Sequence, residues 1–342
     1  MHILYVGPAS GTSLHRLDAL RRLGHAADLL DPRHPALGGA LTSRWVVHTG
    51  AFGVSRLTAG WIRRCLGMRR YDLAIVDGGD LLGPEHVDQL KASCRRVINY
   101  NPDNPYVGCD GQKWRIFLAS VPRYDLIVTP RQSSVAPAYA QGARDVLLVS
   151  FAADEVVHRP PEPAAAKTLD VVFVGTWMKE RGPFFRALLG EGLPVTIFGP
   201  SWHKARERAL LRPNLREGYL DDGRYVAAIA SAKIALALLS AENEDLHTTR
   251  SMEIPAVGTL LCGERTAEHL ALYREGEEAV FWSSPAECAA RCRELLAFPA
   301  DLDRIARAGR ARALRNGRFN ERILARMIDA AISPGAVARS AP

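Results

Sequence analysis

A pair of cationic side chains in a glycine-bounded segment has the chemistry needed to bind a diphosphate. The segment, GTWMKERG at residues 175–182, follows a predicted strand at 170–174 and precedes a predicted helix. Lys179 and Arg181 would supply two positive charges, and the backbone N–H groups of the helix start would add hydrogen-bond donors. The alternative interpretation is a solvated helix start without a ligand.

A second polar segment, residues 243–259, carries two carboxylates eight residues apart. Asp245 falls in a loop after the predicted strand at 233–239, and Glu253 falls in a short predicted helix. A carboxylate inside such a helix is well placed to accept hydrogen bonds from vicinal hydroxyls, as on a sugar. N–H groups at the helix start point toward an anion, and the residues there are His247, Thr248 and Thr249. The alternative is N-capping by Asp245 or Thr248 and a Glu253 on the surface.

The first predicted strand, at 2–7, leads into a turn of small residues, GPASGTS, and a helix at 13–23. Small residues let a ligand approach the backbone, so Ser10, Gly11 and the nearby His15 are candidates for ligand contacts. The turn lacks the glycine pattern of a dinucleotide site and is equally typical of an ordinary tight turn, with His15 on the helix surface.

Other candidates also have two interpretations. Asp103 and Asn104 follow the predicted strand at 96–100, where ligands bind in parallel sheets, although a turn before a proline explains them as well. Three further side chains are candidates to flank a base or a sugar, or to fill space in the protein: Trp177, Trp202 and His203.

Short β-like runs alternate with helical patterns along the chain, which predicts parallel sheets with helices on both faces. In the first half, strands are predicted at 2–7, 27–30, 72–76, 96–100, 125–129 and 145–150. Residues 154–168 hold three prolines without periodicity, which predicts a linker. The alternation then restarts, with strands predicted at 170–174, 195–198, 233–239, 259–262 and 279–282.

We therefore expect an α/β chain of two doubly wound, Rossmann-like domains facing a cleft that holds the ligand. The expected first domain is 1–153, the linker is 154–168 and the second domain is 169–315. The pattern is helical from 286 to 332. Beyond 315 we expect a C-terminal helix, which in one alternative returns to the first domain, and then a disordered tail.

The composition excludes several classes of protein. The chain has 342 residues, of which 47% are hydrophobic and 24% charged, unlike a disordered or fibrous protein. No apolar run is long enough for a transmembrane helix, and the N-terminus is expected to be a strand rather than a signal peptide. The net charge is +7, with 18 basic and 12 acidic residues in the first 150. This excess indicates an anionic partner or a membrane surface, and no nucleic-acid-binding motif accompanies it.

The cysteines indicate a reduced, cytoplasmic protein without a metal site. The six cysteines include no C-x-x-C pair. Cys288 and Cys292 share a predicted helix face, but nothing in the sequence pattern completes a set of metal ligands.

Residues 56–70 (RLTAGWIRRCLGMRR) form a predicted basic amphipathic helix. Such a helix binds an anionic membrane or a lipid-linked phosphate in one interpretation. In the other it is a surface helix that packs its apolar side on the sheet.

The stretch at 247–282 resembles the C-terminal domain of group 1, family 4-like glycosyltransferases, and more narrowly their spore-maturation-type (CgeB-like) branch. That branch carries an R-x-x-E-I-P-A-x-G-x-x-L core, matched by Arg250, Glu253, Ile254, Pro255, Ala256, Gly258 and Leu261. Similar segments are FVGTWMKERGPFFRALL at 173–189, IFGPSWH at 197–203 and YNPDNPY at 100–106. The resemblance covers roughly residues 95–315.

The resemblance implies a GT-B fold, with a nucleotide-sugar donor on the second domain and an acceptor on the first. It implies no metal and no separate cofactor, because cations such as Lys179 and Arg181 would stabilise the leaving diphosphate. In family 4 enzymes a Glu-x7-Glu pair serves the donor. Glu253 takes the place of the ribose-binding second Glu. Asp245 takes the place of the first, which touches the donor sugar, and Glu244 is the alternative.

The remaining site residues implied by the resemblance fall into two groups. The donor side comprises Gly175, Thr176, Trp177, His247, Thr248, Thr249 and Arg250. The acceptor side comprises Ser10, Gly11, His15, Asp103 and Asn104.

The expected activity is transfer of a sugar from a nucleoside diphosphate sugar to a hydroxyl acceptor, with retention at the anomeric carbon, in polysaccharide or glycoconjugate biosynthesis. A lipid-linked molecule and a glycan are both candidate acceptors, and a peripheral contact with the inner membrane face through residues 56–70 is one alternative. A nucleotide-sugar 2-epimerase and a non-catalytic assembly protein on the same fold are the other candidate functions.

Overall fold

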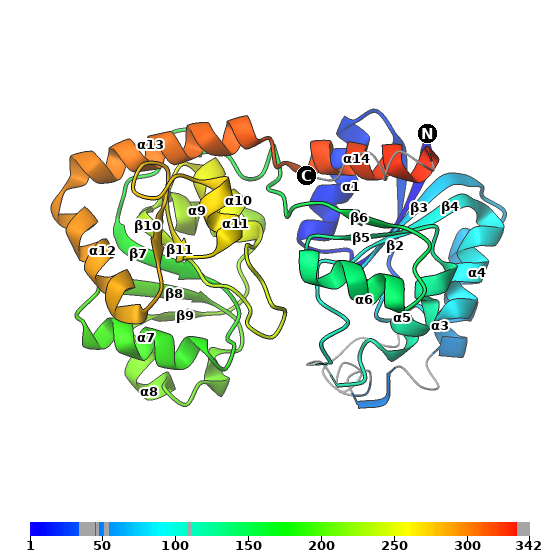
Figure 1. Ribbon diagram of the computed structural model, residues 1–342, viewed down its shortest axis with the longest axis horizontal. Coiled ribbons are helices and arrows are strands. Elements are labelled where there is room, and N and C mark those ends of the chain that lie inside the picture. Colours follow the sequence, from blue (N-terminus) through cyan, green and yellow to red (C-terminus); the bar gives the residue numbers. More distant parts are fainter. Residues whose placement is uncertain (34–44, 46–47, 51–54, 109–110, 334–342) are drawn as a thin grey trace. The chain divides into compact units, whose positions relative to one another are not determined.

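The computed structural model of the protein describes residues 1–33, 45, 48–50, 55–108 and 111–333. The chain divides into two compact units (Figure 1). Unit 1 comprises Met1–Ser150, Glu242–Glu244 and Asn320–Pro342, and unit 2 comprises Phe151–Ala241 and Asp245–Phe319. Among the described residues, no helix combines the length and the apolar character needed to cross a bilayer.

Unit 1 contains a parallel six-stranded sheet in the order β2-β1-β3-β4-β5-β6. Its strands are β1 (His2–Val6), β2 (Ala26–Leu30), β3 (Tyr71–Asp77), β4 (Cys94–Tyr100), β5 (Leu126–Thr129) and β6 (Val146–Leu148). The order reverses between β1 and β3, so loops diverge to opposite sides there and leave a crevice for a ligand. Each strand predicted for this half is present, with ends shifted by one or two residues.

Helices connect these strands. They are α1 (Thr12–Arg22), α3 (Ser55–Leu66), α4 (Pro84–Ser93), α5 (Arg115–Ser120), α6 (Val135–Ala140) and α14 (Asn320–Ile332). The short 3-10 turn η2 (Val121–Arg123) follows α5, and η3 (Gln132–Ser134) precedes α6. The C-terminal helix α14 packs beside α1 in unit 1, where Arg22 Nε lies 2.6 Å from Glu321 Oε1 (Figure 1).

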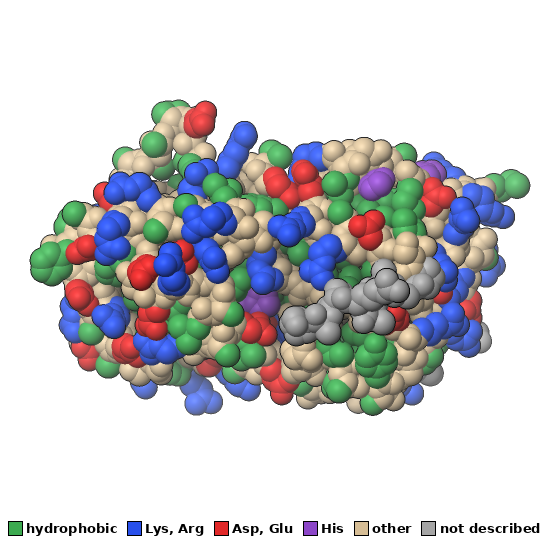
Figure 2. Space-filling model, turned by 45° about the horizontal axis from the view of Figure 1, so that its top comes forward, with side chains coloured by type: hydrophobic (Ala, Val, Ile, Leu, Met, Phe, Trp, Pro, Cys, Tyr) green, Lys and Arg blue, Asp and Glu red, His purple; other side chains and the backbone are tan. Residues whose placement is uncertain are grey.

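The predicted amphipathic helix at 56–70 is observed as α3. Its Ile62 and Leu66 side chains are buried in the core beneath the sheet, whereas Arg63 and Arg64 are exposed. The structure therefore favours a surface helix that packs its apolar side within unit 1. In Figure 2 Lys and Arg side chains lie among acidic and apolar ones over the visible face.

Unit 2 contains a second parallel six-stranded sheet, in the order β12-β11-β10-β7-β8-β9. Its strands are β7 (Leu169–Val174), β8 (Val195–Gly199), β9 (Leu215–Glu217), β10 (Ala232–Ala237), β11 (Leu260–Glu264) and β12 (Val280–Trp282). The edge strand β9 was not predicted, because its three residues, LRE, carry no apolar run. The order reverses between β7 and β10, which places the expected ligand crevice there.

Residues of the unit 2 strands alternate between two cores. Val171 and Phe173 face one core, and Val172 and Val174 face the other. Helices α7 (Arg181–Gly190) and α12 (Pro285–Ala297) cover the first face, and α9 (Asp222–Ala230) and α10 (Thr249–Val257) cover the second. The remaining elements are α8 (Arg208–Leu211), α11 (Ala267–Leu272), α13 (Pro299–Asn316), η4 (Trp202–Lys204) and η5 (Arg212–Asn214). The predicted α/β class with two doubly wound sheets is confirmed.

One expectation about connections is corrected and another is refined. The first residues of the predicted linker at 154–168 pack into unit 2. Asp154 and His158 are buried there, and the Asp154 carboxylate accepts hydrogen bonds from the N–H groups of Val156 and Val157. The stretch at 286–332, predicted to be helical, is divided into three helices. Breaks fall at Pro299, which lacks an N–H, and at Gly317, whose φ is 60°.

Candidate functional site

The carboxyl ends of the unit 2 strands, where the strand order predicts a ligand crevice, gather residues from three loops. Arg181 begins α7 after β7, Asp245 lies in the loop after β10, and Arg250 lies in the first turn of α10. Arg181 Nη1 donates to the Thr176 carbonyl at 2.7 Å, and Arg250 Nε donates to the Val174 carbonyl at 3.1 Å. Both guanidinium groups are therefore tied to backbone at the end of β7.

The two cations repel each other at this position. Arg181 is buried, and burial together with the positive charge of Arg250 lowers the pKa of Arg181 to about 10. Glu180, Glu264 and Asp245 act in the opposite direction. Among the described residues, no carboxylate lies within ion-pair distance of Arg181 or Arg250. An anion bound between them would relieve this repulsion.

The turn between β7 and α7 also contains buried polar atoms without a hydrogen-bond partner among the described residues. They are Trp177 Nε1, both carboxylate oxygens of Glu180, and Arg181 Nε. Such atoms are rare in native proteins, and a cluster of them indicates a place where a ligand or water completes the hydrogen bonds. The predicted diphosphate segment thus contains buried, unsatisfied polar groups.

The other predicted residues of this turn differ in exposure. Thr176 and Lys179 are exposed on the turn. Gly175 is buried, and a Cβ there would lie 2.5 Å from the Phe173 ring, so a glycine is required for packing.

The polar loop before α10 is ordered by its own hydrogen bonds. Asp245 N donates to the Ser240 carbonyl at 3.1 Å, and the Ser240 N–H lies 3.4 Å from Asp245 Oδ2. Thr248 is the N-cap, and its backbone N–H donates to Ser251 Oγ at 3.1 Å. The helix therefore starts at Thr249, and capping by Thr248 rather than Asp245 is the alternative that the structure supports.

His247 forms two hydrogen bonds within unit 2. The Phe151 N–H donates to His247 Nε2 at 3.3 Å, so the ring proton is on Nδ1, which donates to Glu268 Oε2. The imidazole is 7% exposed. Both ring nitrogens are thus hydrogen-bonded within the protein, and His247 links the segment at Phe151 to the start of α10.

Glu253 is buried inside a three-residue cluster. The Tyr225 hydroxyl donates to Glu253 Oε2, and His158 Nε2 lies 3.7 Å from Glu253 Oε1. The Asp154 N–H donates to His158 Nδ1 at 2.8 Å, which leaves the ring proton on Nε2, facing Glu253. The alternative of a surface glutamate is therefore wrong, because the carboxylate is 4% exposed. Sequence reasoning missed Tyr225 and His158, which no local pattern connects to Glu253.

A buried histidine near α10 makes the stability of unit 2 depend on pH. His269 Nδ1 donates to the Glu264 carbonyl at 2.6 Å, and the Ser251 hydroxyl donates to Nε2 at 2.7 Å. Burial lowers the pKa of His269 to about 4. Below about pH 6.5 the unfolded chain binds a proton that the folded chain resists, so stability falls as the pH falls toward 4.

We expect the free energy of unfolding to drop by about 2 kcal/mol between pH 7 and pH 5 through this residue alone. Urea unfolding of wild type and His269→Gln at both pH values measures the effect, and the variant should lose most of this pH dependence. The matched control is His203→Gln, since His203 is exposed. An equal pH dependence in wild type and His269→Gln would contradict the assignment.

In unit 1, the predicted acceptor-side residues spread over two places. Gly11 caps α1 with a φ of 55°, and Ser10 is exposed before it. His15 is buried rather than on the helix surface. Asp103 lines a pocket of about 350 Å³ at the carboxyl ends of β1, β3 and β4. Asn104 is buried, and its Nδ2 lies 3.4 Å from Glu244 Oε2 within unit 1.

The same pocket is built on a buried ion pair that the sequence did not reveal. Asp77 Oδ2 accepts hydrogen bonds from Tyr5 Oη at 2.7 Å, Ser13 Oγ at 2.5 Å and Arg16 Nη1 at 2.8 Å. The Arg16 guanidinium also lies 4.7 Å from the centre of the Tyr100 ring. These groups fix the end of β3 to α1 below the pocket.

Two further expectations are corrected or extended. Trp202 does not flank a ligand, because it is fully buried and its Nε1 donates to the Gly175 carbonyl at 3.0 Å.

The thiols of Cys288 and Cys292 lie close to that of Cys262 from β11, and the three sulfurs lie within 4.8 Å of one another. All three are buried in the apolar core, and sequence spacing did not indicate the third thiol.

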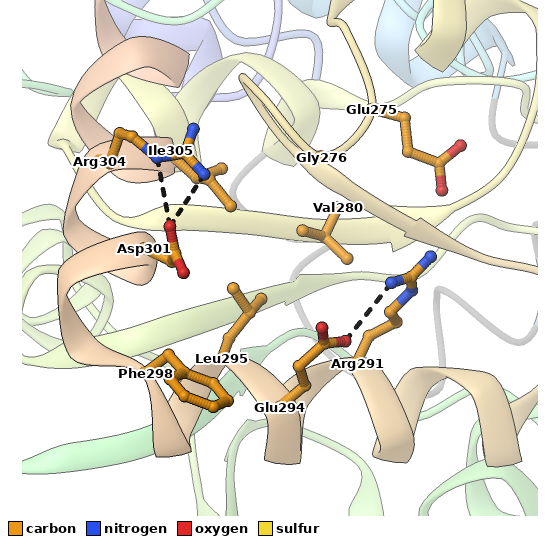
Figure 3. Close-up of a pocket in the computed structure, with 10 residues that line it drawn as sticks. All are labelled: Glu275, Gly276, Val280, Arg291, Glu294, Leu295, Phe298, Asp301, Arg304 and Ile305. Atoms are coloured by element: carbon orange, nitrogen blue, oxygen red, sulfur yellow. Dashed lines mark hydrogen bonds and ion pairs between the residues drawn. The ribbon is translucent and has the colours of Figure 1, made fainter.

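A smaller hollow of about 200 Å³ lies where α12 meets α13 (Figure 3). Four of its charged side chains pair within their own helices, with Arg291 3.4 Å from Glu294 and Arg304 3.1 Å from Asp301, and the fifth, Glu275, pairs with Arg265. Val280 in its wall begins β12, so the hollow is at the amino end of that strand. Ligands of parallel sheets bind at the opposite end, and we do not assign a function to this hollow.

Comparison with known proteins shows what the chain is similar to. Residues 181–329 match the family model described as glycosyl transferase-like. The structure is similar to sucrose-phosphate synthase from Thermosynechococcus elongatus (14% identity over 96% of this chain and 98% of that chain, TM-score 0.69). It is also similar to HepE of Anabaena in complex with UDP and glucose (13% identity, 96% and 100%, TM-score 0.67). A third similar structure is AviGT4, a glycosyltransferase involved in avilamycin A biosynthesis (17% identity, 97% and 97%, TM-score 0.61). No curated protein matches the sequence.

The chain has the GT-B fold, with two Rossmann-like domains. Residues 181–329, which span unit 2 from α7 onward and most of α14, match the glycosyl transferase-like family model, in agreement with the predicted enzyme class. The spore-maturation-type branch stays a prediction.

Proposed function

We propose that the protein transfers a sugar from a nucleoside diphosphate sugar to a hydroxyl acceptor. The observation that carries this proposal is the buried guanidinium of Arg181 beside Arg250 at the crevice of unit 2. Two like charges held together without a carboxylate partner favour a ligand with at least two negative charges. A diphosphate has that charge, and the glycosyl transferase-like family match supports the same ligand class.

In this proposal Arg181, Arg250 and the exposed Lys179 stabilise the departing diphosphate, together with the N–H groups at the start of α10. Cationic groups fixed before the reaction stabilise developing charge without reorganisation, so they supply the leaving-group chemistry without a metal ion. HepE was solved with UDP and glucose, which makes UDP-glucose the first donor to test.

The sugar and ribose contacts are assigned to carboxylates. Asp245 lies in the loop beside the cations and would accept hydrogen bonds from donor-sugar hydroxyls, with Glu244 as the alternative. Glu253, with Tyr225 on one oxygen, would hold the ribose. Retention at the anomeric carbon is part of the proposal and follows from the family resemblance.

Nucleoside diphosphates are expected to stabilise the protein against heat. UDP, GDP, dTDP, ADP and CDP are tested in turn by thermal unfolding, and one base should be preferred. At a concentration 100 times the Kd, the bound diphosphate adds about 2.7 kcal/mol to the free energy of unfolding. Glu253→Ala should reduce this shift.

The matched control is Glu294→Ala, because Glu294 is an exposed glutamate of the same unit. It should respond to the diphosphate like the wild type. If none of the five diphosphates shifts the melting temperature, the donor site is wrong and a non-catalytic role becomes the better explanation.

A further inference from the structure

The pocket of unit 1 is at the ligand-binding edge of its sheet. It has a volume of about 350 Å³, within the range of small-molecule sites, and is lined by loops that follow β1, β2, β3 and β4. The strand order reverses between β1 and β3, the position where doubly wound sheets open a crevice. The position, the size and the converging loops together indicate a site for a small molecule.

The charges that line this pocket pair with one another. Arg16 Nη1 lies 2.8 Å from Asp77 Oδ2, and Lys113 Nζ lies 3.6 Å from Asp103 Oδ2. Arg33 Nε lies 2.9 Å from Asp31 Oδ1. Each cation in the described wall of the pocket therefore already has a carboxylate partner.

One carboxylate in the described wall has no ion-pair partner. Asp80 follows β3 and forms no ion pair among the described residues. Burial raises the pKa of Asp80, Lys113 lowers it and Asp103 raises it further. The negative charge of Asp80 also contributes to raising the pKa of Arg33. The lining holds three cations (Arg16, Arg33 and Lys113) and three carboxylates (Asp77, Asp80 and Asp103). Because Arg33 pairs with Asp31, which lies outside the lining, Asp80 has no cation of its own among the described residues.

This balance differs from that at the unit 2 strand ends, where Arg181 lies near enough to Arg250 to be repelled and neither has a carboxylate within ion-pair distance among the described residues. A phosphate in the unit 1 pocket would compete with Asp31, Asp77 and Asp103 for their cations and would be repelled by Asp80. Hydroxyl groups are favoured instead, because carboxylates accept hydrogen bonds from them and a hydroxyl brings no charge into the pocket. Pro8, Leu81 and Pro102 line the pocket, are partly exposed and add apolar surface for the C–H face of a sugar ring.

We propose that the unit 1 pocket binds an uncharged, hydroxyl-rich molecule, a sugar or glycan end, and rejects phosphorylated acceptors. The identification of this ligand as the acceptor rests on the proposed glycosyltransferase function. Asp80 is the specificity-determining residue, because it accepts hydrogen bonds from acceptor hydroxyls and repels a phosphate.

Saturation-transfer NMR with matched pairs of ligands tests the proposal. The probes are the methyl glycosides of glucose, galactose, mannose and N-acetylglucosamine, and the 6-phosphates of the same sugars, each with the full chain. At least one neutral glycoside should bind, and its phosphate should bind about tenfold more weakly or not at all. Stronger binding of the phosphates, or binding of neither member of any pair, would overturn the proposal.

The variant Asp80→Asn tests whether the ligands bind in this pocket, because it should change the affinities of the two members of a pair in opposite directions. It should weaken the neutral glycoside and strengthen the phosphate, whereas a merely unstable variant would weaken both. Asp88→Asn is the matched control, since Asp88 is an exposed aspartate of unit 1 that pairs with Arg123 at 2.9 Å. Unchanged binding of both ligands to Asp80→Asn would place them elsewhere and refute the assignment.

Thermal shifts with UDP on the same samples separate this proposal from the donor assignment. Nucleotide stabilisation together with a preference for phosphorylated sugars would refute only the acceptor class. Neutral glycoside binding without any nucleotide stabilisation would refute the donor assignment and leave the pocket chemistry standing.

Discussion

Replacing Arg181 with methionine is expected to lower kcat/KM for sugar transfer by a factor of about 10²–10³, the usual effect of removing one fixed group that stabilises developing charge. Methionine keeps an apolar stem against Phe173, over whose ring the guanidinium lies at 5.2 Å. The variant loses the buried charge that is proposed to bind the diphosphate, and Arg250 remains. The measurement is transfer or hydrolysis of radiolabelled UDP-sugars, with the thermal shift on UDP as a second readout.

Arg186→Met is the matched control for this prediction, because Arg186 is an exposed arginine of the same helix α7. Its kcat/KM should stay within about a factor of two of the wild type, as expected for a surface substitution. If Arg181→Met keeps full activity and full UDP stabilisation, then the cation pair does not bind the donor.

Asp77→Ala is expected to lower the free energy of unfolding by about 3–5 kcal/mol, the range for removing one partner of a buried ion pair. Asp77 and Arg16 side chains are 6% and 9% exposed. Burial acts to lower the pKa of Arg16, but the adjacent Asp77 carboxylate raises it well above its ordinary value. Without Asp77 the cation would remain buried without compensation, and the Tyr5 and Ser13 hydroxyls would lose their acceptor. Urea unfolding measures the loss.

Two further variants separate this charge effect from a general loss of packing. In the double variant Asp77→Leu with Arg16→Met, both charges are gone, so most of the stability should return. Asp18→Ala removes an exposed partner of Arg21 on α1 and should change stability by less than about 1 kcal/mol. A double variant as unstable as Asp77→Ala would show that the ion pair is not the cause.

The strands and the cationic segment could be predicted because their signals are local in the chain. Apolar runs such as DVVFV at 170–174 predict a strand that is buried on both faces, and the structure has β7 there with alternate residues in two cores. Edge strand β9 was not predicted, since a three-residue polar strand leaves little periodic pattern. The position of Arg181 at the start of a helix after a strand could likewise be inferred from adjacent residues.

The sequence by itself determined the two α/β domains, the polar loop before α10 and the candidates at the ends of strands. Only the tertiary structure decided which charges meet. Arg250 reaches back 76 residues to Val174 at the end of β7, and Arg16 pairs with Asp77 over 61 residues. The physical reason is strand order: β10 pairs with β7, and β1 pairs with β3, so the loops that follow these strands converge on one crevice in each unit. Local periodicity carries no information about that order, and therefore none about the paired charges of one crevice and the unpaired cations of the other.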